Sequence, residues 1–212
     1  MTEPHVRPAR PADVSSFAAE LGDPGFFVDR MSRHLQGRGV LFLALLDHRP
    51  AGVVYLWLED AEEPPLRRHL PGVPLLTHLE VHRDLRNLGI GAALVEAVER
   101  YSAEHNRDRV TLAVRTDNSA AARLYDRLGY RDWGHGSITC YAQRVLPNGG
   151  ILVEPEHCHV LVKQLLPVKP APRSKALPIG RLVLMRGTST SVRASNGMSK
   201  ASRACPTPEP PR

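Results

Sequence analysis

Residues Leu75 to His105 read LLTHLEVH, then RDLRNLGIG, then AALVEAVERYSAEH. The alternating apolar run predicts a strand, a short turn rich in Arg and Gly follows it, and apolar residues at helical spacing predict a helix from Ile90 onward. Backbone N–H groups in the first turn of a helix lack partners inside the helix, and the helix dipole favours negative charge there. Gly89 and Gly91 would let a bulky ligand approach the backbone. This stretch therefore predicts a phosphate or pyrophosphate site.

Two common phosphate-binding motifs do not fit this turn. A Walker loop requires Lys and then Ser or Thr after its last glycine, whereas Ala92 and Ala93 follow Gly91. A dinucleotide fingerprint requires three glycines spaced G-x-G-x-x-G, and only two are present. The remaining pattern, R-x-x-G-x-G from Arg86 to Gly91 after the strand residues LEVH, resembles the acetyl-CoA pyrophosphate loop of the GCN5-related N-acetyltransferase (GNAT) family. The alternative is an ordinary tight turn between a strand and a helix.

Length and cysteine content limit the classes of protein to which this chain can belong. The 212 residues suffice for one domain with an extension, and no apolar run approaches the length of a membrane span. The segment MTEPHVRPARPAD lacks an apolar signal core, so we expect no export and a cytoplasmic location. The cysteines are sparse and odd in number, which favours a reducing compartment over a disulfide framework: Cys140, Cys158 and Cys205.

The charge is distributed unevenly along the chain. Nine of the 28 Lys and Arg residues, but only one of the 22 acidic residues, follow residue 166, so the net charge of +6 belongs to the C-terminal segment. That segment is also rich in Pro and Ser and poor in large apolar residues, which is typical of disorder. We predict one folded domain over residues 1–166 and a Pro/Ser/Arg-rich basic tail over residues 167–212.

Hydrophobic periodicity predicts alternating strands and helices over residues 5–166. Helices are expected near residues 11–21, 26–36, 90–105 and 120–128, a loop over 60–74, and strands at 5–7, 40–46, 52–58, 75–82, 109–115, 130–133, 140–145, 151–154 and 158–165. This order matches the GNAT fold. The resemblance thus implies an α/β (α+β) domain with a central mixed, largely antiparallel twisted sheet of about six to seven strands, flanked by about four helices.

The resemblance also implies a cofactor, acetyl-CoA, and residues that hold it. In the GNAT family the strand before the loop carries a bulge, and its backbone pairs with the pantetheine arm, a role that maps onto Leu79 and Val81. The pyrophosphate would lie on backbone N–H groups of the loop, mainly those of Asn87, Leu88, Gly89, Gly91 and Ala92. Arg86 would add positive charge, or would alternatively tie the loop to a nearby carbonyl.

A second segment, after the strand at 109–115, strengthens the resemblance. Asn118, Ala121 and Tyr125 fit the family's N-x-x-A-x-x-x-Y pattern. Asn118 is expected to contact the pantetheine arm, to cap the following helix, or to do both. Tyr125 lies two turns further along the same helix face, where its hydroxyl would bind near the sulfur and protonate the leaving thiolate. The alternative is a core tyrosine.

The residue that takes the proton of the attacking amine is expected on the central strand. Glu80 should face away from Leu79 and Val81 because strand side chains alternate, and His78 and His82 share its face. A carboxylate on this strand is a common general base in the family. The alternatives for Glu80 are a buried structural carboxylate or a substrate anchor.

These observations favour an acetyl-CoA-dependent N-acetyltransferase that acts on a primary amine, either a small molecule or a protein N-terminus or lysine. Acidic residues at 59–63 would favour a cationic amine, and the family's frequent dimerisation through C-terminal strands admits a homodimer. One alternative is a non-catalytic acyl-CoA sensor, although Tyr125 and Asn118 argue against it. Another is nucleic-acid or membrane binding through the tail, which lacks interleaved aromatics. The cluster at His157, Cys158 and His159 lacks the spacing of a metal site, so no metal is expected.

Overall fold

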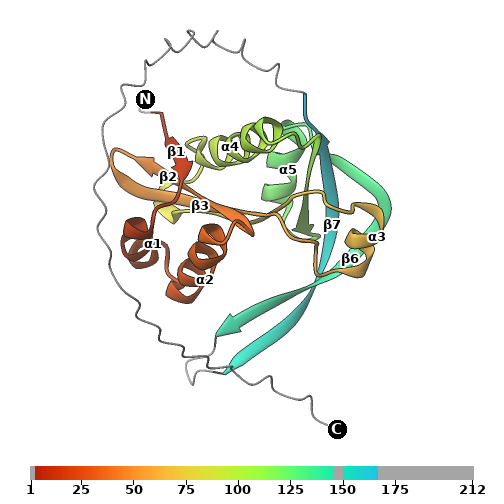
Figure 1. Ribbon diagram of the computed structural model, residues 1–212, viewed down its shortest axis with the longest axis horizontal. Coiled ribbons are helices and arrows are strands. Elements are labelled where there is room, and N and C mark those ends of the chain that lie inside the picture. The colour runs from red at the N-terminus through yellow and green to blue at the C-terminus, as the bar shows by residue number, and fades with distance from the viewer. Residues whose placement is uncertain (1–2, 146–149, 167–212) are drawn as a thin grey trace, which may run out of the picture. The chain divides into compact units, whose positions relative to one another are not determined.

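Seven strands form one sheet in the computed structural model, which describes residues 3–145 and 150–166 (Figure 1). The spatial order is β1-β2-β3-β4-β5-β7-β6, and all neighbours are antiparallel except β4 and β5. The strands are β1 (His5–Pro8), β2 (Gly39–Leu46), β3 (Arg49–Trp57), β4 (Leu75–Val81), β5 (Arg109–Arg115), β6 (Arg131–Val145) and β7 (Ile151–Gln164). The predicted tail, residues 167–212, lies outside the described residues.

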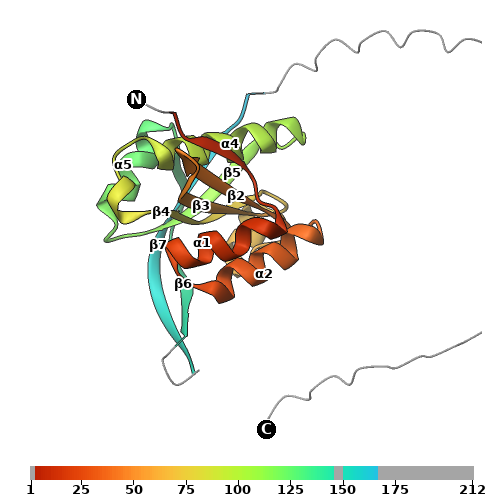
Figure 2. The ribbon, with the colours of Figure 1, turned by 90° about the vertical axis from the view of Figure 1, so that its left-hand side faces the viewer.

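Helices cover both faces of this sheet, as Figures 1 and 2 show. α1 (Val14–Leu21) and α2 (Pro24–Leu35) pack on one face, while α4 (Ile90–Glu104) and α5 (Ser119–Arg127) pack on the other. A short helix, α3 (Pro64–His69), lies near β6 and β7, and two single 3₁₀ turns, η1 (Pro11–Asp13) and η2 (Arg83–Leu85), complete the described elements. No helix in residues 3–145 or 150–166 has the length and apolar character needed to cross a bilayer.

Alternating side chains of the strands divide the core between the two faces. Under α4 and α5, the strands bury residues such as Leu56, Leu76 and Leu112 against Leu94 and Val98 of α4. On the opposite face, a second set of strand residues packs against α1 and α2, with Phe17 and Phe27 as the helix anchors. The predicted fold class is confirmed, and the strand, turn and helix of the central stretch lie where expected.

Two parts of the fold differ from the sequence-based prediction. The predicted loop over residues 60–74 contains α3, which begins at Pro64 and buries Leu66 against β6 and β7 residues. Because one apolar residue in six gives no helical periodicity, this helix depends on tertiary burial. The breaks predicted within the last strands are also wrong, since β6 and β7 each continue as one long strand.

The sheet opens between its two parallel strands. β4 and β5 pair with each other only at Leu75 with Thr111 and at Leu76 with Leu112. Beyond these two pairs, no residue of β4 is paired with a residue of β5. On its other side β4 stays paired with β3, through a bulge that places two residues, His78 and Leu79, opposite Val54. The edge of β4 facing β5 is therefore unpaired beyond Leu76 and can accept an extended ligand as an added strand.

Candidate active site

The loop between β4 and α4 presents a row of unpartnered backbone donors. Within the described residues, none of the N–H groups from Asn87 to Ala92 donates to a backbone carbonyl or a side chain. Asn87 and Gly89 adopt left-handed backbone conformations, with φ of 64° and 82°, on either side of Leu88. Alternation of this kind turns successive N–H groups to one side and forms an anion-binding concavity. The loop therefore has the geometry expected for a bound phosphate, reinforced by the N-terminus of α4.

Two residues of the motif also have roles within the protein itself. Arg86 is exposed, and its Nε donates to the carbonyl oxygen of Val81 at 3.4 Å, which ties the loop to the end of β4. A Cβ atom on Gly91 would lie 3.4 Å from a methyl group of Leu124 and 3.8 Å from one of Val81. A Cβ on Gly89 would meet nothing within 4 Å, but its positive φ disfavours any other residue. Gly91 thus allows α4 to approach α5, whereas Gly89 sets the path of the loop.

The open edge of β4 supplies a further backbone donor next to this loop. His82 donates its N–H to the carbonyl of Ala51 in β3 at 2.9 Å. Because donors alternate between the two sides of a strand, the N–H of Val81 points away from β3, towards the opening. The side chains of Leu79 and Val81 pack against the core under α4 and α5.

Asn118 and Tyr125 both belong to α5, which follows the free end of β5. Asn118 is the N-cap, and its Oδ1 accepts the N–H of Ala121 at 3.1 Å. Capping uses the oxygen of the side-chain amide and leaves its two N–H donors for another partner. The preceding residue, Asp117, forms an ion pair with Arg115.

The Tyr125 side chain is almost fully enclosed, with 5% of its surface exposed. Its ring packs edge-on against Tyr130 at a centroid distance of 5.6 Å. Burial raises the pKa of the Tyr125 phenol to about 12, because the charged form loses its hydration. The phenol therefore keeps its proton at neutral pH, so it can donate a proton but cannot serve as the base.

The opposite face of β4 carries a pair of ionisable side chains at the bulge. His78 Nε2 lies 3.3 Å from Glu80 Oε2, and the His78 imidazole stacks on the ring of Phe26 in α2, at 3.7 Å between centroids. Burial lowers the pKa of His78, while the nearby carboxylates of Glu80 and Asp23 oppose this effect. Glu80 and His78 thus share the face that the alternation predicted, and a neutral imidazole lies beside the carboxylate.

Two neighbours of this pair could not be anticipated from the sequence. The stacking partner Phe26 lies 52 positions before His78, and only the packing of α2 on the sheet brings the two rings together. Glu20 of α1 approaches His82 Nε2 at 3.7 Å. Glu20 also pairs with Arg49 at 3.1 Å, and the Arg30 guanidinium lies over the Phe26 ring at 5.6 Å, so acidic and basic side chains both surround the His78–Glu80 pair.

The acidic segment predicted to attract an amine is partly neutralised. Glu59 pairs with Arg33 at 2.8 Å and with Arg38 at 3.7 Å, so its charge is already matched by two guanidinium groups.

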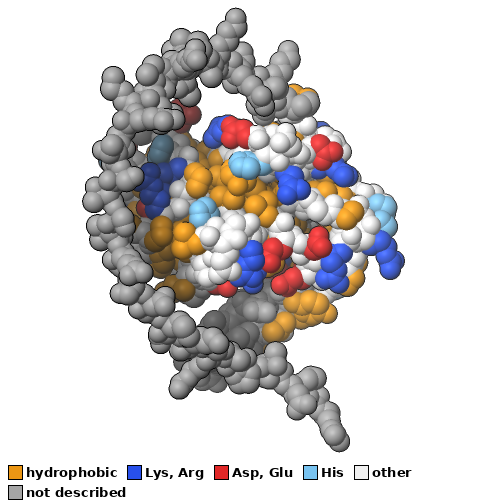
Figure 3. Space-filling view, in the orientation of Figure 1, with side chains coloured by type: hydrophobic (Ala, Val, Ile, Leu, Met, Phe, Trp, Pro, Cys, Tyr) orange, Lys and Arg blue, Asp and Glu red, His pale blue; other side chains and the backbone are white. Residues whose placement is uncertain are grey.

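In the described chain, no three His, Cys, Asp or Glu side chains converge as metal ligands would. Figure 3 shows acidic and basic side chains interspersed on the visible face, with no single large basic patch there.

Comparisons with known proteins agree with this geometry. The sequence matches the model of the acetyltransferase (GNAT) family over residues 9–130, more than half of the chain. A curated relative, an uncharacterized N-acetyltransferase of Methanocaldococcus jannaschii, is 44% identical over 55 residues, which are 26% of this chain and 35% of the relative. That match spans about a third of the relative's length.

Solved structures share the fold at low sequence identity. An N-acetyltransferase from Staphylococcus aureus Mu50 is 11% identical with a TM-score of 0.57, covering 78% of this chain and 100% of its own. The ribosomal-protein-S18-alanine N-acetyltransferase of Escherichia coli is 15% identical with a TM-score of 0.54, and the match covers 84% of this chain and 100% of the Escherichia coli chain. A GNAT acetyltransferase from Elizabethkingia anophelis with acetyl-CoA bound is 15% identical with a TM-score of 0.50, and the match covers 76% of this chain and 98% of the Elizabethkingia chain. The chain belongs to the acetyltransferase (GNAT) family.

Proposed function

We propose that this protein is an N-acetyltransferase that moves the acetyl group of acetyl-CoA to a primary amine by direct attack in a ternary complex. The observation that carries the proposal is the row of unpartnered N–H groups from Asn87 to Ala92 at the mouth of the open β4–β5 pair. A pyrophosphate on the loop and a pantetheine arm along β4 would satisfy both features at once. The family match supports the same chemistry.

The cofactor would be held mainly by backbone groups. The N–H groups of Asn87, Leu88, Gly89, Gly91 and Ala92 bind the pyrophosphate, and the exposed Arg86 adds charge. The edge of β4 at Leu79 and Val81 pairs with the pantetheine arm, and a backbone N–H there polarises the thioester carbonyl. The free amide donors of Asn118 contact the same arm. Such preorganised donors stabilise the negative charge of a tetrahedral intermediate.

Two side chains on opposite faces of β4 would manage the protons. On the α2 side, Glu80 accepts the proton that the ammonium must lose before its nitrogen can attack, and the neutral His78 beside it can share that proton. The neutral amine then attacks, the new C–N bond forms and the C–S bond breaks. Tyr125, on the α5 side, donates its phenolic proton to the sulfur as CoA leaves, and the second proton that the nitrogen loses as the amide forms passes through water to restore the phenol. No step in this sequence needs a metal.

The acceptor would approach the face formed by α1, α2 and the β4 bulge. The carboxylates of Asp23 and Glu80 act on His78 from this end, and the Phe26 ring adds an apolar surface. These features favour a cationic primary amine with an apolar neighbouring group. A small amine, a lysine side chain and a protein N-terminus all meet this description.

A thiol-release assay with acetyl-CoA and a panel of primary amines tests the proposal. Turnover on at least one amine is expected, and Tyr125→Phe should lower it strongly while leaving acetyl-CoA binding intact. Tyr141→Phe is the matched control, because Tyr141 is 67% exposed and lies far along β6. Acetyl-CoA binding without turnover on any amine would favour an acyl-CoA sensor instead.

A further inference from the structure

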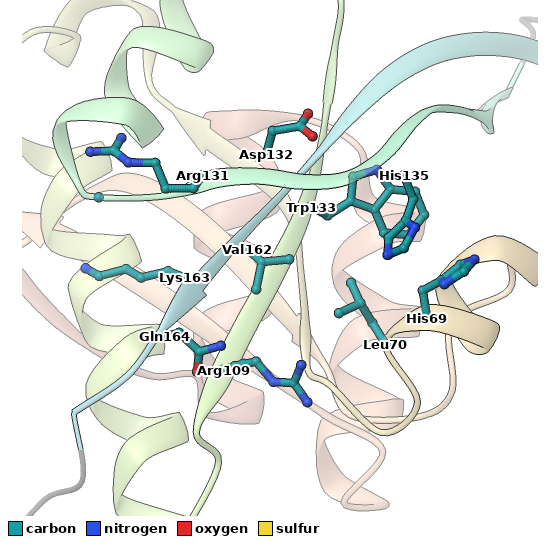
Figure 4. A pocket seen from close by; sticks show the side chains of 11 residues that line it. His69, Leu70, Arg109, Arg131, Asp132, Trp133, His135, Val162, Lys163 and Gln164 are labelled. Carbon is teal, nitrogen blue, oxygen red and sulfur yellow. The ribbon is translucent and has the colours of Figure 1, made fainter.

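One cavity in the described chain lies away from the cofactor loop. It has a volume of about 560 Å³, within the range of small-molecule sites. Its walls come from the end of α3, the first residues of β5 and β6, and the last residues of β7 (Figure 4). A smaller cavity of about 360 Å³ includes Arg115 and Asp117 and adjoins the acetyl-transfer site already described.

The larger cavity is well separated from the proposed reaction centre. Arg109, in its wall, begins β5, whereas Arg115 ends the same strand just before the cap residue Asn118. At 3.3 Å per residue, the two ends of β5 are about 20 Å apart. The cavity also lies at the closed end of the β4–β5 pair, where Leu75 and Thr111 are paired. A ligand here would not occupy the acetyl-CoA site.

One cation in this cavity lacks a hydrogen-bond partner. The Nε atom of Arg109 is buried and makes no hydrogen bond in the described chain, and its ion pair with the exposed Asp108 is long, at 3.6 Å. The other two cations of the wall, by contrast, each form a short hydrogen bond with a carboxylate. Arg131 donates to Asp126, and Lys163 donates to Glu99, each at 2.6 Å. Figure 4 shows both of these side chains directed away from the Arg109 guanidinium.

The remaining walls are apolar or aromatic and are built by specific contacts. Leu70 and Val162 line the cavity beside Arg109, and the Trp133 indole stands edge-on to the imidazoles of His69 and His135. Those two imidazoles stack at 3.9 Å between centroids, which joins the end of α3 to β6.

This aromatic wall is formed by an irregular excursion of β6. Four residues of β6, 133–136, lie opposite a single residue of β7, Val160, where the pairing shifts between Asp132 and Ser137. Trp133 Nε1 donates to the carbonyl of Gly136 at 2.6 Å, and Gly134 donates its N–H to Asp132 Oδ1 at 2.7 Å. Gly134 and Gly136 both have positive φ, which glycine adopts without steric cost and which lets the excursion turn within four residues.

We infer that this cavity is a second ligand site, which takes a small carboxylate attached to an apolar or aromatic body. The guanidinium of Arg109, whose one recorded charge partner is the exposed Asp108 at 3.6 Å, would receive the carboxylate, for which its fork of donors is suited. Leu70, Val162 and Trp133 would cover the apolar body. A ligand bound here would contact α3, β6 and the start of β5, at a site separate from the proposed acetyl-transfer site.

Calorimetric titration of the full chain with 3-phenylpropionate tests this site, with 3-phenylpropionamide as the neutral isostere. The carboxylate should bind at least about 10-fold more tightly than the amide, which corresponds to one charge-assisted hydrogen-bonded pair. Arg109→Met should remove that difference, whereas Arg131→Met should retain it within about two-fold, because Arg131 is engaged by Asp126. Inorganic phosphate, which lacks an apolar body, should bind more weakly than 3-phenylpropionate.

Acetyl-CoA titration of Arg109→Met serves as the folding control and should match the wild type. Absence of 3-phenylpropionate binding at millimolar concentration, or equal binding of acid and amide, would overturn the inference. Displacement of 3-phenylpropionate by acetyl-CoA would also overturn it, because the two ligands would then share one site. These outcomes do not depend on whether the protein acetylates any amine.

Discussion

Asn118 combines two roles that a pair of substitutions can separate. Its Oδ1 accepts the Ala121 N–H at 3.1 Å and caps α5, while its amide N–H groups are free to contact the cofactor. Asn118→Ala removes both functions. Asn118→Asp keeps the capping oxygen, since Asp is as good an N-cap as Asn, but removes the donors and adds a negative charge.

The expected magnitudes follow from these contacts. Loss of an N-cap costs about 1 kcal/mol of unfolding free energy, so Asn118→Ala should lower the melting temperature by about 2–4 °C for a domain of this size. Asn118→Asp should melt within about 1 °C of the wild type. Loss of one hydrogen bond to the cofactor should weaken acetyl-CoA binding by about 10-fold in both variants.

Thermal unfolding and acetyl-CoA titration on the same three preparations distinguish the roles. Asp23→Ala is the control, because Asp23 caps α2 through Phe26 at 3.0 Å and lies on the opposite face of the sheet from α5. It should lower stability without changing acetyl-CoA affinity. If Asn118→Asp binds acetyl-CoA as tightly as the wild type does, the contact between Asn118 and the pantetheine arm is refuted, and only the capping role remains.

Three further perturbations probe the site and the fold. Tyr125→Phe should leave acetyl-CoA affinity unchanged but lower kcat by about 10²–10⁴-fold, measured by thiol release, and an unchanged kcat would remove Tyr125 as the acid. Lys163→Met should lower the free energy of unfolding, measured in urea, by about 2–3 kcal/mol, because it leaves Glu99, only 13% exposed, without its cation. A decrease below about 0.5 kcal/mol, which is the usual effect of a surface substitution, would contradict this. The Arg7 hydrogen bond lowers the pKa of Asp13 from 3.8, so the stability from this pair is present above pH 3.8 and is lost as the pH falls through the lowered pKa. Asp13→Asn should therefore reduce the acid dependence of unfolding, and an unaltered pH profile would show that the pair contributes nothing.

The sequence was most informative where structure is determined locally. The alternating run, the glycine turn and the helical stripe from Leu75 to His105 gave the strand, loop and helix at nearly the right boundaries. The capping role of Asn118 and the left-handed conformation of Gly129 were also predictable, because both depend on neighbours within a few residues. A positive φ at Asn87, by contrast, is not indicated by the motif.

Contacts between distant segments were not predictable from one sequence. Periodicity placed His78 and Glu80 on one face of β4, but it could not show that Phe26 of α2 stacks on His78. α3 was missed because its single anchor, Leu66, belongs to a cluster whose other buried residues, Ile138, Cys158 and Val160, are distant in the sequence. The cavity around Arg109 depends on the same non-local packing, since its walls come from four separate elements.

The central claim is that the loop from Asn87 to Ala92 holds the pyrophosphate of acetyl-CoA, and one titration tests it most directly. Amide resonances of the full chain would be followed by NMR during addition of acetyl-CoA and, separately, of S-acetylpantetheine, which lacks the pyrophosphate. We expect acetyl-CoA to shift the amides of residues 87–92 and to bind at least about 10-fold more tightly than S-acetylpantetheine, which should leave these amides unshifted. Unshifted loop amides at saturating acetyl-CoA, or no binding at all, would show that the loop is only a turn between β4 and α4.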